Sequence, residues 1–267
     1  MSGADRGRWR ERDEMALIEF EVRDKLAFIT LNRPEKMNAI NEEMVELMFE
    51  ILAEVSRDKG VRACILTGNG KAFSSGHDLT YFAGERTQEA RPVSDLYQVI
   101  LELPRPCFAA INGICLAGGA GIALSTDIRL MAEGARLGWP QVKRGVSSVS
   151  GPFLLANLVP RNIAYEILFT GEFLSAERAL ELGLVNRVVP EGSDILEETE
   201  ALARQVMKNA PLAIQAIKDF TVRARHLSSS DALRMGDLLF KKFVDSEDGQ
   251  EGLAAFLEKR EPNWKNK

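Results

Sequence analysis

A glycine-rich stretch at positions 112–121 could place backbone hydrogen-bond donors directly against a ligand. It follows the apolar stretch 107–111, which predicts a buried strand that ends before the glycines. The small residues then predict the start of a helix, whose first N–H groups have no internal partner and lie at the positive end of the helix dipole. We therefore expect Gly118 and Gly119 to offer donors to an oxygen that becomes negative.

A second turn of the same kind occurs earlier in the chain. Residues 62–67 predict another strand, and a Gly-Asn-Gly turn at 68–70 leads into residues 72–79, where small residues surround Gly76. Two donor-bearing turns can hold one carbonyl oxygen between them, which is the arrangement of an oxyanion hole. The alternative is that the glycines only let a helix pack closely on a sheet.

Other chemistries fit these residues less well. The glycine stretch has neither the Lys-Ser/Thr pair of a P-loop nor the third glycine of a dinucleotide fingerprint. Ser147, Ser148 and Ser150 are not part of a Gly-x-Ser-x-Gly nucleophile elbow. The only histidines are His77 and His226, far apart in the sequence, so we expect no metal site.

The elements that must position the two turns can be predicted from hydrophobic periodicity. Residues 16–22 and 26–31 predict a β-hairpin, and Asn41 is expected to cap a helix that continues to Val55. Residues 80–92 are polar and without pattern, which predicts a mobile loop over the site. Further strands are expected at 61–67, 107–111 and 127–132, and helices at 195–207, 213–223, 232–244 and 252–256.

Composition limits the classes of function. A chain of 267 residues with 45% hydrophobic and 27% charged residues predicts a soluble, folded protein with a substantial core. A net charge of -5 without a basic run argues against nucleic acid, and no apolar segment reaches the roughly 20 residues that cross a membrane. Cys64, Cys107 and Cys115 read as buried free thiols of a reducing compartment, so we expect a cytoplasmic location.

Taken together, the two glycine turns resemble the signature of the crotonase family, also called the enoyl-CoA hydratase/isomerase family. The stretches concerned are Ala-Phe-Ser-Ser-Gly-His-Asp-Leu at 72–79 and Asn-Gly-Ile-Cys-Leu-Ala-Gly-Gly-Ala-Gly at 112–121. The resemblance extends from Ile18 to Trp264 and includes the segments 31–39, 183–190 and 246–260. The order and spacing of so many segments argue against chance.

The resemblance implies an α/β fold, a crotonase-like spiral of ββα units with a C-terminal helical trimerisation region. It divides the chain into a disordered tail at 1–14, a spiral core with an acyl-CoA site at 15–192, and a helical oligomerisation region at 193–267. A homotrimer or a dimer of trimers is expected. No tightly bound cofactor is implied, because coenzyme A arrives as part of the thioester substrate.

By the family motif, the backbone N–H groups of His77 and Gly118 are the oxyanion donors, and a role of the His77 ring in proton transfer stays open. Two further residues, Phe240 and Lys259, are expected to close over coenzyme A bound to a neighbouring subunit. The complete set assigned to thioester or CoA binding is Lys36, Met37, Ala39, Ala72, Ser75, Asp78, Leu79, Trp139, Pro140, Phe240 and Lys259.

The sequence departs from the family pattern at two positions. Family members that hydrate enoyl thioesters carry a glutamate three residues after the donor glycine and another beside a proline about twenty residues later. This chain has Gly121 and Gln141 there, and neither can give and take a proton near pH 7. Gln141, our third catalytic candidate, can still hold a water or a carbonyl by hydrogen bonds, or it is a surface or packing residue.

The expected activity is therefore enoyl-CoA hydratase/isomerase-type chemistry through a thioester enolate, with slow ordinary hydration. One alternative is a CoA thioester hydrolase or decarboxylase that uses the same oxyanion hole with His77, Asp78 or Tyr81 near the chemistry. Another is a non-catalytic CoA-binding or assembly subunit, which the loss of both glutamates would favour.

Overall fold

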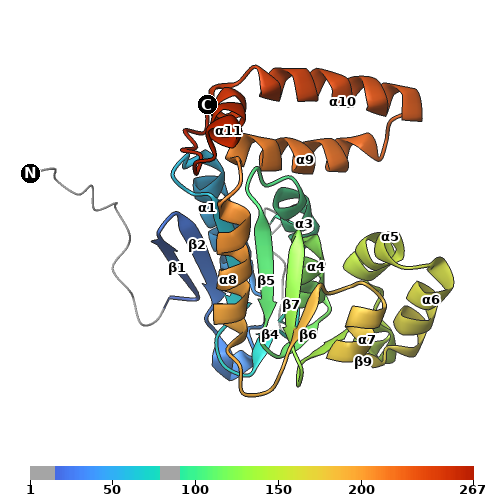
Figure 1. The fold of residues 1–267 in the computed structure, drawn as a ribbon. Helices are drawn as coiled ribbons and strands as arrows, with labels where there is room; N and C mark the ends of the chain where they lie inside the picture. The colour runs from blue at the N-terminus through green and yellow to red at the C-terminus, as the bar shows by residue number, and fades with distance from the viewer. Residues whose placement is uncertain (1–15, 79–90) are drawn as a thin grey trace, which may run out of the picture.

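A computed structural model describes residues 16–78 and 91–267. Within these residues, six strands form one sheet in the order β1-β2-β3-β5-β7-β10 (Figure 1). Strands β1 and β2 form the predicted antiparallel hairpin, and the remaining neighbours in this sheet are parallel. The strands are β1 (Ile18–Arg23), β2 (Leu26–Leu31), β3 (Ala63–Gly68), β5 (Cys107–Ile111), β7 (Ile128–Ala132) and β10 (Arg187–Val189).

A second sheet of the described chain consists of four three-residue strands in the order β4-β6-β8-β9. They are β4 (Ala72–Ser74), β6 (Ile114–Leu116), β8 (Arg136–Gly138) and β9 (Phe173–Ser175). Three residues are too few to show a periodicity, so the sequence did not predict them. In particular, β6 lies between the strand at 107–111 and the helix that follows, where we expected a direct junction.

This second sheet brings the two glycine turns together. Strands β4 and β6 are parallel neighbours, and each follows a longer strand of the first sheet after a short turn. The turn around Gly76 comes directly after β4, and the glycines at 118 and 119 come directly after β6. Since parallel neighbours have their carboxyl ends at the same end of a sheet, the two turns lie at one end of this sheet.

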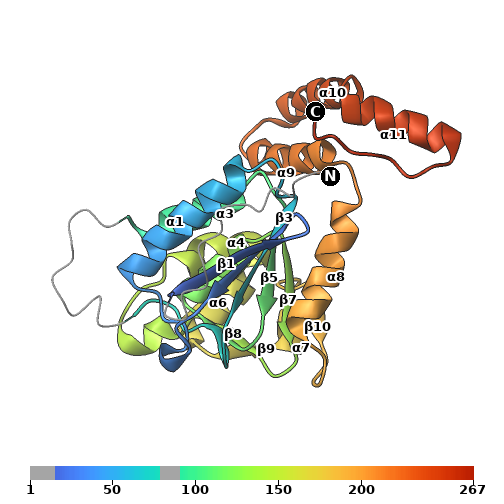
Figure 2. The same cartoon turned by 90° about the vertical axis from the view of Figure 1, so that its left-hand side faces the viewer.

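Helices cover the larger sheet on both faces (Figure 2). On one side lie α1 (Glu42–Arg57), α3 (Val93–Leu101) and α4 (Gly118–Ser125), and on the other lies α8 (Ile195–Met207). Alternate residues of β2 serve the two faces: Ile29 belongs to the main core, whereas Phe28 packs in the cluster beneath α8. As predicted, α1 is capped by Asn41, whose side chain accepts from the Met44 N–H at 3.0 Å.

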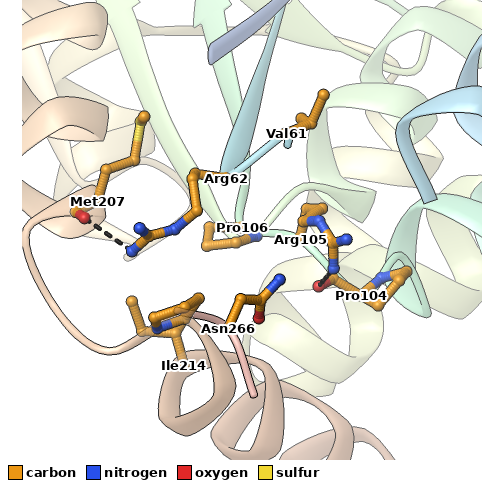
Figure 3. A pocket seen from close by; sticks show the side chains of 9 residues that line it. Val61, Arg62, Pro104, Arg105, Pro106, Met207, Ile214 and Asn266 are labelled. Carbon is orange, nitrogen blue, oxygen red and sulfur yellow. Dashed lines mark hydrogen bonds between the residues drawn. The ribbon is translucent and has the colours of Figure 1, made fainter. Parts of the chain in front are cut away.

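The C-terminal helices form a separate group at one end of the molecule (Figure 1). They are α9 (Pro211–Ala224), α10 (Ser229–Val244) and α11 (Glu247–Glu258), each longer than the expected segment. Polar residues fill the first turns of α10 and α11, whereas α9 begins two residues early with Pro211 and Leu212. Lys218 of α9 fixes them to the core through its ammonium group, which lies 2.7 Å from Asp127 Oδ2 and 3.1 Å from the Arg105 carbonyl oxygen. Nearby, Arg62 donates to the Met207 carbonyl at 2.8 Å (Figure 3).

The remaining described elements are helical. The turn η1 (Pro34–Lys36) lies between β2 and α1. Between β8 and β10 lie the turns η2 (Pro140–Arg144) and η3 (Gly151–Leu155) and the helices α5 (Ala156–Leu158), α6 (Arg161–Thr170) and α7 (Ala176–Glu181). All three cysteines are buried and free, as predicted. In the described part of the chain, no helix is both long and apolar enough to span a membrane. The expected tail at 1–14 and most of the loop at 80–92 lie outside the described residues.

Candidate functional site

The two glycine turns touch one another. Gly76 has a φ of 95°, which favours glycine, and a Cβ atom built there would lie 2.8 Å from Ala117 Cβ and 3.1 Å from the Gly118 nitrogen. Gly118 is the first residue of α4, and no side chain of the described residues caps this helix. Its N–H group, which has no acceptor within the helix, therefore lies beside the turn at Gly76.

The backbone of His77 is oriented by its neighbours. The Ile40 N–H donates to the Gly76 carbonyl at 2.8 Å, and the Asp78 N–H donates to the Ile40 carbonyl at 2.9 Å, as in a parallel bridge. The Gly76 carbonyl and the His77 N–H belong to one trans peptide group and point in opposite directions, so the His77 N–H points away from Ile40.

The His77 side chain lies at the same place. A Cβ atom at Gly118 would be 2.8 Å from both Nδ1 and Cε1 of the imidazole, so the ring packs directly on the glycine. Burial lowers the pKa of His77, which keeps the ring neutral at pH 7. An uncharged imidazole therefore lies beside the first residue of α4.

Two polar contacts hold the segment 33–40 against β4 and the turn that follows it. The buried Asn38 donates to the Ala72 carbonyl at 2.7 Å and accepts from the Arg33 N–H at 2.8 Å. Arg33 also pairs with Asp78, with 2.7 Å between Nη1 and Oδ2. Asn38 is absent from the candidates that we selected by motif, although its φ of 53°, a conformation that asparagine tolerates better than most residues, marks it as a turn residue.

This packing assembles several of the predicted binding residues. The Ser75 N–H donates to the Met37 carbonyl at 2.9 Å, which places Lys36, Met37 and Ala39 alongside Ala72, Ser75 and Asp78. Lys36 and Met37 are exposed, whereas Ala39 and Ala72 are buried. Leu79 and Tyr81 lie outside the described residues, so their expected roles stay predictions.

The other predicted binding residues are arranged differently. Trp139 and Pro140, at the junction of β8 and η2, are buried, and the indole N–H of Trp139 donates to Ser150 Oγ at 3.1 Å. Phe240 of α10 and Lys259, the C-cap of α11, are exposed and belong to the group of helices at the far end of the molecule (Figure 1). Within one chain the fold does not bring them to the turns, so their assignment to a neighbouring subunit stays a prediction.

The two positions where the family resemblance leads one to look for glutamates have distinct surroundings. A Cβ atom at Gly121 would lie 2.5 Å from Tyr97 Cζ and 2.7 Å from Ser150 Cβ, so these two side chains occupy the space beside the helix. Gln141 is on η2, and its Oε1 atom is buried without a hydrogen-bond partner among the described residues. Motif spacing gave no signal for Tyr97, because it reaches the site from α3, a separate helix.

Two hollows elsewhere do not include either turn. The smaller, with a volume of about 10 Å³, is lined by residues around Arg62 and Arg105 (Figure 3), and it has room for about one water molecule. The larger, with a volume of about 710 Å³, lies between the segment 101–104, α9 and α10.

Comparison with known proteins identifies the family and the fold of this chain. Residues 21–267 match the family model described as enoyl-CoA hydratase/isomerase. The short-chain-enoyl-CoA hydratase of Clostridium acetobutylicum is 34% identical over 92% of this chain and 97% of its own length. The carnitinyl-CoA dehydratase of Salmonella enteritidis is 37% identical over 90% of this chain and 94% of its own.

A solved structure gives the same result for the fold. The enoyl-CoA hydratase of Bacillus anthracis superposes with a TM-score of 0.89 at 31% identity, covering 94% of this chain and all of that one. The predicted fold class and the family resemblance are therefore confirmed.

We predict that the His77 imidazole titrates below the usual value of about 6.5. Because the pKa is lower in the folded state, the unfolded chain binds more protons as the pH falls through that range, so this group's contribution to stability declines below about pH 6.5. His77→Gln should remove that part of the pH dependence of the melting temperature between roughly pH 7.5 and 5.5. NMR titration, with His226→Gln to assign the second ring, measures the pKa directly, and a His77 value above the usual one would contradict the prediction.

Proposed function

Because this chain belongs to the enoyl-CoA hydratase/isomerase family, we propose that it stabilises an enolate of an acyl-CoA thioester between the backbone N–H groups of His77 and Gly118. The observation that carries the proposal is the contact between the two turns, with a built Cβ of Gly76 only 3.1 Å from the Gly118 nitrogen. Coenzyme A is brought by the substrate, and we propose no tightly bound cofactor.

The proposed N–H donors act on the negative charge that develops at the thioester carbonyl oxygen. When a proton leaves the carbon next to a thioester, or a nucleophile adds to the conjugated double bond, the carbonyl oxygen becomes negative. Preorganised N–H groups then contribute more to the transition state than to the bound substrate, by about 2.7–4 kcal/mol for each donor. The His77 ring is neutral, so it does not offset the negative charge on this oxygen, and the N–H groups must stabilise it.

The surroundings of Gly121 and Gln141 support a reaction other than fast hydration of a simple enoyl thioester. Neither residue supplies a carboxylate, and positioned proton transfer is worth about 10²–10⁴-fold in rate. The buried Oε1 of Gln141 is an acceptor suited to a water or a hydroxyl group of the substrate. We therefore propose slow hydration of crotonyl-CoA and faster turnover of a thioester that brings its own polar group to Gln141.

Replacing Gly118 by proline tests the proposed donor. Proline is tolerated at the first position of a helix, so the change removes the N–H, and it also brings side-chain atoms against the His77 ring and strains the turn at Ala117. We expect kcat on acyl-CoA substrates to fall by about 10²–10³-fold, as on removal of other oxyanion donors. Steady-state kinetics on a panel of enoyl-, β-hydroxyacyl- and β-ketoacyl-CoA thioesters provide the measurement.

Gly118→Ala is the matched control, because it retains the N–H but adds a Cβ atom against the same His77 ring. The proline variant should be the slower of the two. Equal activities would place the chemistry at other groups, and binding of CoA without turnover of any thioester by the wild-type protein would favour a non-catalytic subunit.

We also propose that the C-terminal helices join copies of the chain into a trimer or a dimer of trimers. Large apolar side chains of α10 and α11 are exposed, including Leu238 at 72%, Phe240 at 73% and Phe256 at 81%. The two helices extend beyond the core (Figure 2), and apolar faces of this kind are stable when a partner covers them.

Light scattering should therefore give a mass of three or six chains of 29.6 kDa. Leu238→Glu, which places a charge in the proposed interface, should shift the population towards smaller species. Leu180→Glu on α7 is the control, since Leu180 is also exposed but lies outside α10 and α11. A wild-type monomer at micromolar concentration would contradict the proposal.

A further inference from the structure

We propose that Ser150 is a positioning residue of this site: it holds the peptide between Ala117 and Gly118 so that the Gly118 N–H points at the thioester oxygen. The proposal rests on the proposed function and adds a residue to the same site. Ser150 Oγ donates to the Ala117 carbonyl at 3.2 Å. This carbonyl and the Gly118 N–H belong to one planar peptide group, so a restraint on the oxygen also fixes the direction of the N–H.

The peptide that Ser150 contacts needs such a restraint. Ala117 has φ 52° and ψ -113°, a conformation that residues with a side chain rarely adopt. Strained backbone persists only where its surroundings determine it, and it occurs often at functional sites. Here the Ala117 N–H donates to the Gly138 carbonyl at 2.9 Å, and its carbonyl accepts from the Gly121 N–H at 3.0 Å as well as from Ser150.

Ser150 is itself surrounded by two aromatic side chains. The Trp139 indole N–H donates to Ser150 Oγ at 3.1 Å, and Tyr97 lies beside Ser150 at Gly121, with its hydroxyl donating to the Gly118 carbonyl at 3.5 Å. All three residues are buried, so water does not compete for these bonds. Burial raises the pKa of Tyr97 to about 12, and the phenol therefore stays protonated and neutral at pH 7.

Gly121 allows Tyr97 and Ser150 to pack against α4. Because glycine has no side chain, these two residues fill the space beside it, and a Cβ atom there would lie within 2.7 Å of both. A glutamate at position 121 and the present Tyr97–Ser150 pair therefore exclude one another sterically. Position 121, which lacks the expected glutamate, is therefore also the position that leaves room for the Ser150 hydroxyl. This hydroxyl holds the peptide between Ala117 and Gly118.

The test compares Ser150→Ala with wild type by infrared difference spectroscopy on crotonyl-CoA labelled with carbon-13 at the thioester carbonyl. Wild type should shift the carbonyl stretch to lower frequency, since the N–H groups polarise the bond. Ser150→Ala should lose part of this shift, and kcat should fall about tenfold with little change in KM, a smaller loss than the 10²–10³-fold expected when a donor is removed. Ser150→Thr, which keeps a hydroxyl, should restore both the carbonyl shift and kcat.

Ser125→Ala is the matched control. Ser125 is equally buried, lies at the end of α4, the helix that begins at Gly118, and donates to the Gly121 carbonyl at 2.8 Å, so its loss costs a similar hydrogen bond away from the strained peptide. It should lower the melting temperature without altering the carbonyl shift. Tyr97→Phe gives a second variant that keeps the ring and should reduce the shift less than Ser150→Ala.

The outcomes separate the two claims. If the wild-type protein lowers the carbonyl stretching frequency and Ser150→Ala lowers it equally, the proposed enolate site is supported and the proposed role of Ser150 is wrong. The role is also wrong if Ser125→Ala loses the same part of the shift. If wild type itself produces no shift, the proposed function fails and the positioning role fails with it.

Discussion

The structure depends on the close approach of two backbone turns, one at Gly76 and the other at Ala117 and Gly118. A Cβ atom at Gly76 would lie within 2.9 Å of both Ala117 Cβ and the Leu116 carbonyl oxygen, so the approach requires glycine. Parallel pairing of β4 with β6 brings the two turns to the same end of the sheet, and the bridge between Ile40 and His77 fixes the turn at Gly76. The remaining strands and helices keep these short elements in register.

The two positions at which the family resemblance implies glutamates carry no carboxylate in this chain. Tyr97 and Ser150 fill the space next to Gly121, and Gln141 offers a buried carbonyl oxygen. All three are neutral, as is His77 with its lowered pKa. Burial strengthens the proposed interaction of the two N–H groups with a developing oxyanion, because the effective dielectric constant is lower there than in water.

Much of the fold and both glycine turns could be predicted from the sequence, because the turns follow apolar strands whose patterns are long enough to recognise. The hairpin, the Asn41 cap and the C-terminal helices were all predicted from periodicity and capping residues. The four three-residue strands were not, since their pairing is decided by tertiary contacts. Tyr97 and Ser150 were missed for a related reason: they lie on separate elements, and only the fold brings them to Gly121.

The most direct test of the central claim is a crystal structure of the protein with acetoacetyl-CoA, a thioester that readily forms an enolate. The account predicts that the thioester oxygen lies about 2.7–3.1 Å from the backbone nitrogens of both His77 and Gly118. A well-ordered complex in which that oxygen contacts neither nitrogen would contradict it.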